Sequence, residues 1–402
     1  MSTRRQPFGE SWRAWAGLAV GVLAVSAHSA SSVNLSVLMK TILGEFGWSR
    51  SEWAAATTVR LIALVLAMPL VGRATDRWGA RTMLGFGAGV VGLALGGMAL
   101  MHSWTTLMAV SVVMGPAQAC VGSVAASALV LRLFRRHRAL AIGMLNGGDN
   151  VLNAGVPHAS ARVLDAFGWR LAVAGMAGVY LLLALLIRGV LAESDGRAAR
   201  HPERRATAPL PWRDPRWWAI VATYVAIYAW VTSLQLHFHA YQTDLGRSPL
   251  LAADLLSTQI LVGALGAPLF GLVAERTSAR FALVLATAGL AAGAGTLWNI
   301  EAPWALRAWA IGYGLANSGA VALLALVLEE CFGAARIGSL LGGAMFFCMG
   351  STLLANQWTA GVFDYYGSYR VAWQTYTVLM TLTLVPVAWL WRRGAPALAP
   401  QP

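Results

Sequence analysis

The chain has 402 residues, of which 57% are hydrophobic and only 12% are charged. A soluble domain usually carries about 25% charged residues, so this composition excludes an ordinary water-soluble protein. The formal net charge of +13 at pH 7 would suit a nucleic-acid-binding protein if the basic residues formed one patch. They are scattered from loop to loop, so we expect no nucleic-acid partner.

Long apolar runs follow one another along the chain, separated by short segments with Arg, Asp, Pro or Gly. A membrane-spanning helix needs about 20 apolar residues, and the runs lack the alternating polarity of a membrane β-barrel. We therefore predict an all-α integral membrane protein with twelve transmembrane helices. The predicted spans cover approximately residues 14–41, 52–72, 82–101, 105–130, 139–163, 171–191, 216–240, 249–274, 280–298, 304–328, 337–361 and 371–391.

The basic residues indicate how these spans are oriented. Most of them lie in the loops after the second, fourth, sixth, eighth and tenth spans or near the two chain ends. The positive-inside rule assigns these segments, and so both termini, to the cytoplasm of a protein in the bacterial inner membrane. Cys120, Cys331 and Cys348 show no metal-ligand spacing, and we expect neither a cofactor nor a metal.

The longest polar segment divides the chain into two halves. We predict an N-terminal six-helix bundle at residues 1–192, a cytoplasmic linker at 193–215 and a C-terminal six-helix bundle at 216–402. A loop that runs from Pro69 to Arg81 recurs 199 residues later as the segment from Pro268 to Arg280. Both copies lie where the second predicted helix of their half meets the cytoplasm, as a duplicated six-helix unit predicts.

The first copy has the pattern Gly-x-x-x-Asp-Arg-x-Gly-x-Arg, which resembles the signature loop of the major facilitator superfamily. The resemblance implies two pseudo-symmetric six-helix bundles that transport a solute. An acid at a helix end can pair with an Arg of a neighbouring helix and stabilise one conformation, so we expect both loops to control conformational change. The residues concerned are Gly72, Asp76, Arg77, Gly79 and Arg81, with Gly271, Glu275, Arg276 and Arg280 in the second copy.

Four further parts of the sequence are informative: Glu45–Arg50, Phe134–Gly143, Gly168–Arg170, and His237 followed by Asp244–Gly246. In these parts the chain is similar to one branch of that superfamily, the monocarboxylate porters and oxalate/formate exchangers. This branch implies a small carboxylate as substrate. It commonly carries an Arg in the eighth span that is thought to bind the substrate carboxylate, and Ala267 stands at that position here.

Two charged residues that lie many residues from the cytoplasmic ends of their predicted spans need an explanation, Arg60 in the second span and Asp149 in the fifth. A charge within a span costs about 2.5–3.5 kcal/mol on insertion scales, so each needs a partner or a water-filled cavity. Their predicted depths agree within roughly 3 Å. One interpretation is a fixed structural ion pair. The other is that Arg60 binds an anionic substrate and that Asp149 is its alternative partner or a proton site.

Polar residues also share helix faces, which indicates contact with protein or water instead of lipid. Helix–helix hydrogen bonding would explain them too. We predict Asn146, Asn150, Tyr224, Tyr228, Tyr313 and Asn317 as further substrate contacts, and Asp149 with His237 or His239 as groups that couple protons.

These patterns predict a secondary active transporter that moves a small organic anion, coupled to protons or by exchange. An efflux antiporter for amphipathic compounds is the alternative, although its pattern has adjacent Gly and Pro, whereas Val156 separates Gly155 from Pro157 here. A membrane enzyme or a non-transporting sensor is a remote alternative, because no known catalytic motif or signalling domain is present. The expected partners are a small molecule, membrane lipid and a proton.

Overall fold

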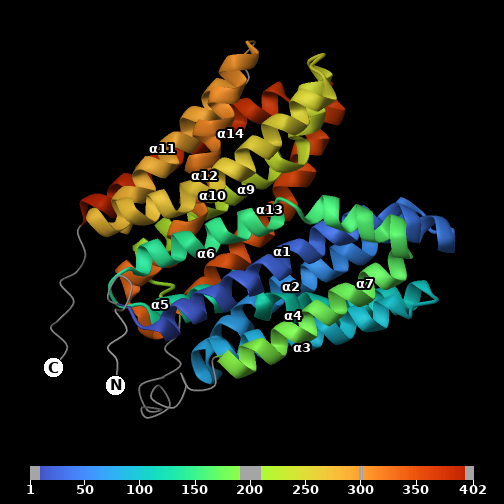
Figure 1. Ribbon diagram of the computed structural model, residues 1–402. Coiled ribbons are helices and arrows are strands. Elements are labelled where there is room, and N and C mark those ends of the chain that lie inside the picture. Colours follow the sequence, from blue (N-terminus) through green and yellow to red (C-terminus); the bar gives the residue numbers. More distant parts are fainter. Residues whose placement is uncertain (1–9, 191–209, 298–299, 301, 394–402) are drawn as a thin grey trace. The chain divides into compact units, whose positions relative to one another are not determined.

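The computed structural model describes residues 10–190, 210–297, 300 and 302–393, and every regular element in them is a helix (Figure 1). Most of the predicted linker 193–215 lies outside the described residues. The first half contains α1 (Trp12–Phe46), α2 (Arg50–Trp78), α3 (Ala80–Ala99), α4 (Trp104–Val121), α5 (Ser123–Leu133), α6 (Arg138–Asn153) and α7 (Val156–Val190). The second contains α9 (Pro215–Asp244), α10 (Pro249–Arg276), α11 (Ala279–Leu297), α12 (Pro303–Phe332), the short 3₁₀ helix η3 (Ala334–Arg336), α13 (Ile337–Tyr366) and α14 (Arg370–Arg392).

Within the described part of the chain, eleven helices are long and apolar enough to cross a membrane. This confirms the prediction of an all-helical, multi-pass membrane protein. The predicted fifth span, 139–163, is divided because α6 ends at Asn153 and its remaining residues begin α7. Helix α7 bends at Gly168, where φ is 73° and ψ is 169°. The count of twelve spans and the cytoplasmic position of both termini stay predictions.

Local sequence sets the ends of the helices. Ser49 precedes α2 and forms a capping box with Glu52, in which each side chain accepts a hydrogen bond from the other residue's backbone N–H. Helix α1 ends at Gly47, whose φ of 67° favours glycine. Asp214 caps α9, and Pro215 occupies its first turn, where a missing N–H costs nothing. These signals fix the end of α1 and the starts of α2 and α9.

The chain separates into two compact units by its contacts. Unit 1 consists of most of the first half together with Ala334–Gly343, which leads into α13. Unit 2 consists of most of the second half together with His137–Asn150, which leads into and forms most of α6. Each unit therefore includes the start of a helix from the other half of the sequence. The domain boundaries at residues 192 and 216 stay predictions.

The two units use the same set of packed helix pairs. In unit 1, α2 packs on α4, and α3 packs on both α4 and α7. In unit 2, α10 packs on α12, and α11 packs on both α12 and α14. Small residues allow the close approach: a Cβ at Gly87 of α3 would lie 2.6 Å from the Cβ of Cys120 on α4. The repeated packing agrees with the repeat in the sequence.

Candidate functional site

The side chain of Arg60, on α2, takes part in a chain of hydrogen bonds inside unit 1. Its Nη1 donates to Oε1 of Gln118 on α4 at 3.0 Å. Nε2 of Gln118 then donates to Oγ of Ser31 on α1 at 2.9 Å, and that hydroxyl donates to the carbonyl of His28 at 2.8 Å. Three helices therefore meet around one guanidinium group.

A glycine on α4 explains why Gln118 reaches Arg60. A Cβ at Gly115 would lie 2.9 Å from both the Cβ of Ala63 and the backbone nitrogen of Leu64 on α2. Only glycine permits this approach of α4 to α2. Gln118 follows Gly115 by three residues, so it lies on the same face of α4 and is directed at the same helix.

The bond from Arg60 goes to a neutral amide. Among the residues of unit 1 that the structure describes, no carboxylate forms an ion pair with Arg60. A half-buried guanidinium without a countercharge is costly inside a membrane, and a bound anion offsets that cost. This cluster can therefore hold an anion.

Two more polar side chains lie near the Arg60 cluster. Tyr180 of α7 is 2% exposed, and its hydroxyl donates to the carbonyl of Ala27 at 2.8 Å. Nδ1 of His28 is buried and has no hydrogen-bond partner among the described residues. A buried polar atom without a partner usually indicates a water or a ligand. Nδ1 of His28 is therefore a second group of the cluster, besides the Arg60 guanidinium, that a ligand could contact.

The cluster has a counterpart in unit 2, displaced by the same 199 residues. Gln259 of α10 corresponds to Arg60, and Asn317 of α12 corresponds to Gln118. Gly314 corresponds to Gly115, and its Cβ would lie 2.7 Å from the carbonyl oxygen of Gln259. Nε2 of Gln259 and Oδ1 of Asn317 are buried and lack hydrogen-bond partners among the described residues. The geometry is repeated, but the positive charge is present only in unit 1.

The predicted polar face of α6 lies in unit 2. Nδ2 of Asn150 donates to Oγ of Ser318 on α12 at 3.2 Å, whereas Nδ2 of Asn146 donates to the carbonyl of Ile142 on its own helix. Asp149 is half-buried on the same helix. Arg60 and Asp149 belong to different units, so their pairing stays a prediction.

The predicted tyrosines have different surroundings. Tyr224 is fully buried, and its hydroxyl donates to the carbonyl of Ala320 at 3.0 Å, which joins α9 to α12. Tyr313 is 2% exposed and stacks on Trp309 with ring centroids 5.1 Å apart, and its hydroxyl has no partner among the described residues. Tyr228 is half-buried. Their roles as substrate contacts stay predictions.

The structure separates the two predicted histidines. His239 is exposed, whereas His237 is half-buried beside Tyr369, whose hydroxyl lies 3.4 Å from its Nδ1. Nε2 of His237 is buried and has no partner among the described residues. Of the two, His237 is the one whose ring is enclosed by neighbouring side chains. A role of either histidine in coupling protons stays a prediction.

The acids of the two signature loops bind the starts of helices from the other half of the sequence. In unit 1, Asp76 accepts hydrogen bonds from the backbone N–H of Gly338 at 3.0 Å and of Ser339 at 2.6 Å, and it pairs with Arg132. In unit 2, Glu275 accepts from the backbone N–H of Leu140 at 3.0 Å. The donors Leu140 and Ser339 are again 199 residues apart. The orphan N–H groups of a helix start favour a carboxylate there.

Two glycines of the signature loops allow these close contacts. A Cβ at Gly271 would lie 2.5 Å from the carbonyl oxygen of Ala139, and one at Gly72 would collide with the carbonyl of Gly338.

The arginines of the two loops have different surroundings. Arg280 pairs with Glu330 at 2.8 Å, and Arg81 donates to the backbone carbonyl of Arg188 at 2.8 Å. Gly79 ends α2 with a φ of 89°, whereas Arg77 and Arg276 are exposed. Control of conformational change by these residues stays a prediction.

Sequence reasoning missed Gln118, Ser31, Tyr180 and Gln259. Gln118 and Gln259 are single amides inside long apolar runs. The 199-residue offset was the signal that could have found Gln259, because it aligns Gln259 with Arg60.

Comparisons with known proteins agree on one fold. A family model described as Major Facilitator Superfamily matches residues 21–253. Among solved structures, a bacterial homologue of the iron transporter ferroportin in its outward-facing state is similar, with a TM-score of 0.72 and 13% identity over 95% of this chain and 100% of that chain. The proton:xylose symporter XylE bound to 6-bromo-6-deoxy-D-glucose gives a TM-score of 0.74 and 14% identity over 94% of this chain and 95% of that one. No curated protein matches the chain in sequence.

Proposed function

Because the chain belongs to the Major Facilitator Superfamily, whose members are transporters, we propose that it moves a small organic anion across the bacterial inner membrane by alternating access. A carboxylate is the proposed substrate class, and transport is coupled to protons or proceeds by exchange. The proposal rests chiefly on the Arg60 guanidinium, whose partner in unit 1 is the neutral amide of Gln118.

The chemistry of this cluster favours a carboxylate over a neutral solute. A guanidinium group presents parallel N–H donors that match the two oxygens of a carboxylate. Nη1 of Arg60 is already held by Gln118, which fixes the orientation of the group before a substrate arrives. Pre-oriented donors lose less entropy when they bind, so Arg60 is suited to act as the anchor.

Coupling to protons has separate candidates in unit 2. Asp149 is a half-buried acid within α6, and His237 has one ring nitrogen near Tyr369 and the other buried without a described partner. Either residue can exchange a proton near neutral pH when its surroundings change. We propose Asp149 as the principal coupling group, with His237 as the second.

The test is transport by the purified full-length chain in proteoliposomes. A panel of labelled small mono- and dicarboxylates is compared with xylose as a neutral solute. We expect uptake of at least one carboxylate, loss of that uptake in Arg60→Gln, and a strong reduction in Arg60→Lys, since an ammonium cannot replace the planar fork. Thermal unfolding of each variant must match the native chain. Carboxylate uptake by Arg60→Gln with native affinity would remove Arg60 as the anchor.

A further inference from the structure

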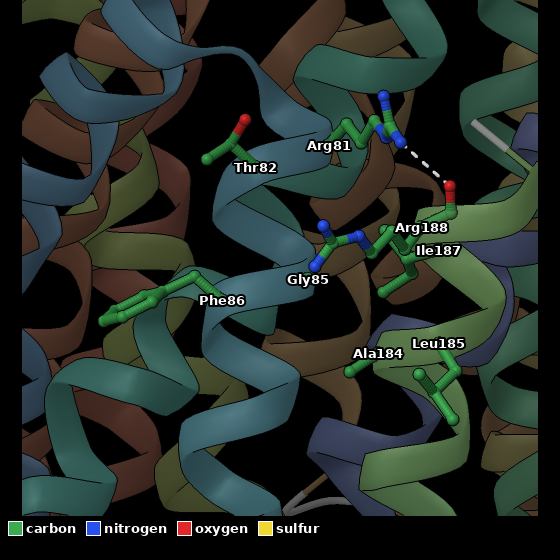
Figure 2. Close-up of a pocket in the computed structure, with 8 residues that line it drawn as sticks. All are labelled: Arg81, Thr82, Gly85, Phe86, Ala184, Leu185, Ile187 and Arg188. Atoms are coloured by element: carbon green, nitrogen blue, oxygen red, sulfur yellow. Dashed lines mark hydrogen bonds between the residues drawn. The ribbon is translucent and has the colours of Figure 1, made fainter. Parts of the chain in front are cut away.

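A groove of about 400 Å³ lies between α3 and α7 in unit 1, and its lining includes no residue of the Arg60 cluster. Figure 2 shows its residues on the two walls, with Arg81 on α3 and Arg188 on α7. Both arginines belong to the helix ends that the positive-inside bias assigns to the cytoplasm. The groove therefore opens where the headgroups of the inner leaflet would lie.

The basic end of the groove is held in a fixed geometry. Nη2 of Arg81 donates to the backbone carbonyl of Arg188 at 2.8 Å, the bond drawn in Figure 2. This bond ties the start of α3 to the last turn of α7 and keeps the Arg81 guanidinium at the groove. The side chain of Arg188 is exposed and lines the same groove. Two positively charged side chains therefore line this groove.

The walls away from the arginines are apolar and exposed. Phe86 of α3 is 59% exposed and Leu185 of α7 is 67% exposed, and both line the groove. Gly85 leaves room between them, because its Cβ would meet only Cγ2 of Ile187, at 3.6 Å. An amphipathic molecule with a negative head and a hydrocarbon tail complements this surface.

The second copy of the loop differs at this position. Arg280, which corresponds to Arg81, is only 8% exposed and pairs with Glu330 at 2.8 Å. The exposed basic groove is therefore a property of the first copy and is not a general consequence of the fold.

We propose that this groove binds an anionic phospholipid of the inner leaflet. Its phosphate lies between Arg81 and Arg188, and one acyl chain follows Phe86 and Leu185. The charge complementarity of the two arginines selects an anionic headgroup over a zwitterionic one. Arg81 belongs both to the groove and to the first signature loop. The contacts of that loop would therefore depend on how much anionic lipid the membrane contains.

The experiment uses the purified full-length chain in detergent and native mass spectrometry. Phosphatidylglycerol and phosphatidylcholine with identical acyl chains are titrated separately. We expect the native chain to bind phosphatidylglycerol more tightly, and Arg188→Gln to weaken that binding by about fivefold. Arg276→Gln is the matched control, because Arg276 is also an exposed arginine in the last turn of a helix but lies outside the groove. This variant should bind as the native chain does.

A second variant tests the apolar part while leaving both charges in place. Gly85→Leu fills the groove and should weaken phosphatidylglycerol binding even though Arg81 and Arg188 are intact. Equal binding of the two lipids by the native chain would overturn the proposal, as would native binding by both Arg188→Gln and Gly85→Leu. Displacement of phosphatidylglycerol by excess inorganic phosphate would also overturn it, by identifying the occupant as a small soluble anion.

Discussion

Ser339 donates two hydrogen bonds to the carboxylate of Asp76, one from its backbone N–H and one from its hydroxyl, both at 2.6 Å. The donor begins α13 and the acceptor lies near the end of α2, so a residue of the first half holds a helix of the second. Glu275 and Leu140 repeat this relationship in unit 2.

We expect Asp76→Asn to destabilise the chain by about 1–3 kcal/mol, because charged hydrogen bonds to a helix start are lost along with the ion pair to Arg132. Glu275→Gln should cost less, since fewer hydrogen bonds to Glu275 than to Asp76 are seen among the described residues. Thermal unfolding in detergent measures both. Asp165→Asn, at an exposed acid, is the control and should leave the melting temperature unchanged. A smaller loss for Asp76→Asn than for Glu275→Gln would contradict this ranking.

A carboxylate introduced beside Arg60 should compete with the substrate. Gln118→Glu has nearly the same shape as the native residue and provides Arg60 with its own counterion at the position of the present 3.0 Å contact. We expect the affinity for the transported anion to fall by at least about tenfold while the chain still folds. Calorimetric titration gives the affinity.

Gln118→Ala provides the comparison for this variant. It removes the amide but leaves the charge of Arg60 in place, so the affinity should change by no more than about threefold. Native affinity in Gln118→Glu would show that the anion binds elsewhere.

The pH dependence of stability should depend in part on Glu45, which lies beyond the apolar part of α1. The indole N–H of Trp169 donates to it at 2.5 Å and Arg170 pairs with it, and these contacts hold the pKa of Glu45 below its usual value. A lowered pKa in the folded state means that the contribution is present above the ordinary pKa and is lost as the pH falls through the lowered one.

Melting temperatures measured from pH 6 downward test this dependence. The native chain should lose stability below about pH 4.5, and Glu45→Gln should lose less over the same range. The effect should be small, because the side chain is 40% exposed and solvent screens the pair. Parallel curves for the two proteins would exclude Glu45 as the source.

If Asp149 carries the coupled proton, Asp149→Asn should abolish accumulation against a gradient while exchange of labelled for unlabelled substrate continues. A permanently neutral side chain resembles the protonated state, so the transporter can still cycle while loaded. Proteoliposomes with an imposed pH gradient measure both activities, and His237→Gln is assayed alongside. Uphill accumulation by Asp149→Asn would assign the proton to another group.

Much of the fold was predictable because its signals are local or repeated. Apolar runs predicted helices, and the pattern around Asp76, repeated at Glu275, predicted the superfamily before any contact was known. The division of the predicted fifth span was missed, because hydropathy does not register the two turn residues after Asn153. The branch within the superfamily and the carboxylate substrate stay predictions.

The surroundings of Arg60 were harder to predict. The sequence identified a charge inside a span, but its partner lies 58 residues away on another helix. That contact depends on the approach of α4 to α2 at Gly115, which no periodicity in either helix encodes. Gln118 therefore looked like an isolated amide.

The contacts at Gly115 and Gly314 involve mainly backbone atoms of α2 and α10, so they depend little on the side chains that those helices carry. Arg60 and Gln259 occupy the same position in two copies of one frame, and one is a cation while the other is neutral. A substitution at either position therefore changes the charge inside its unit without requiring the helices to be repacked.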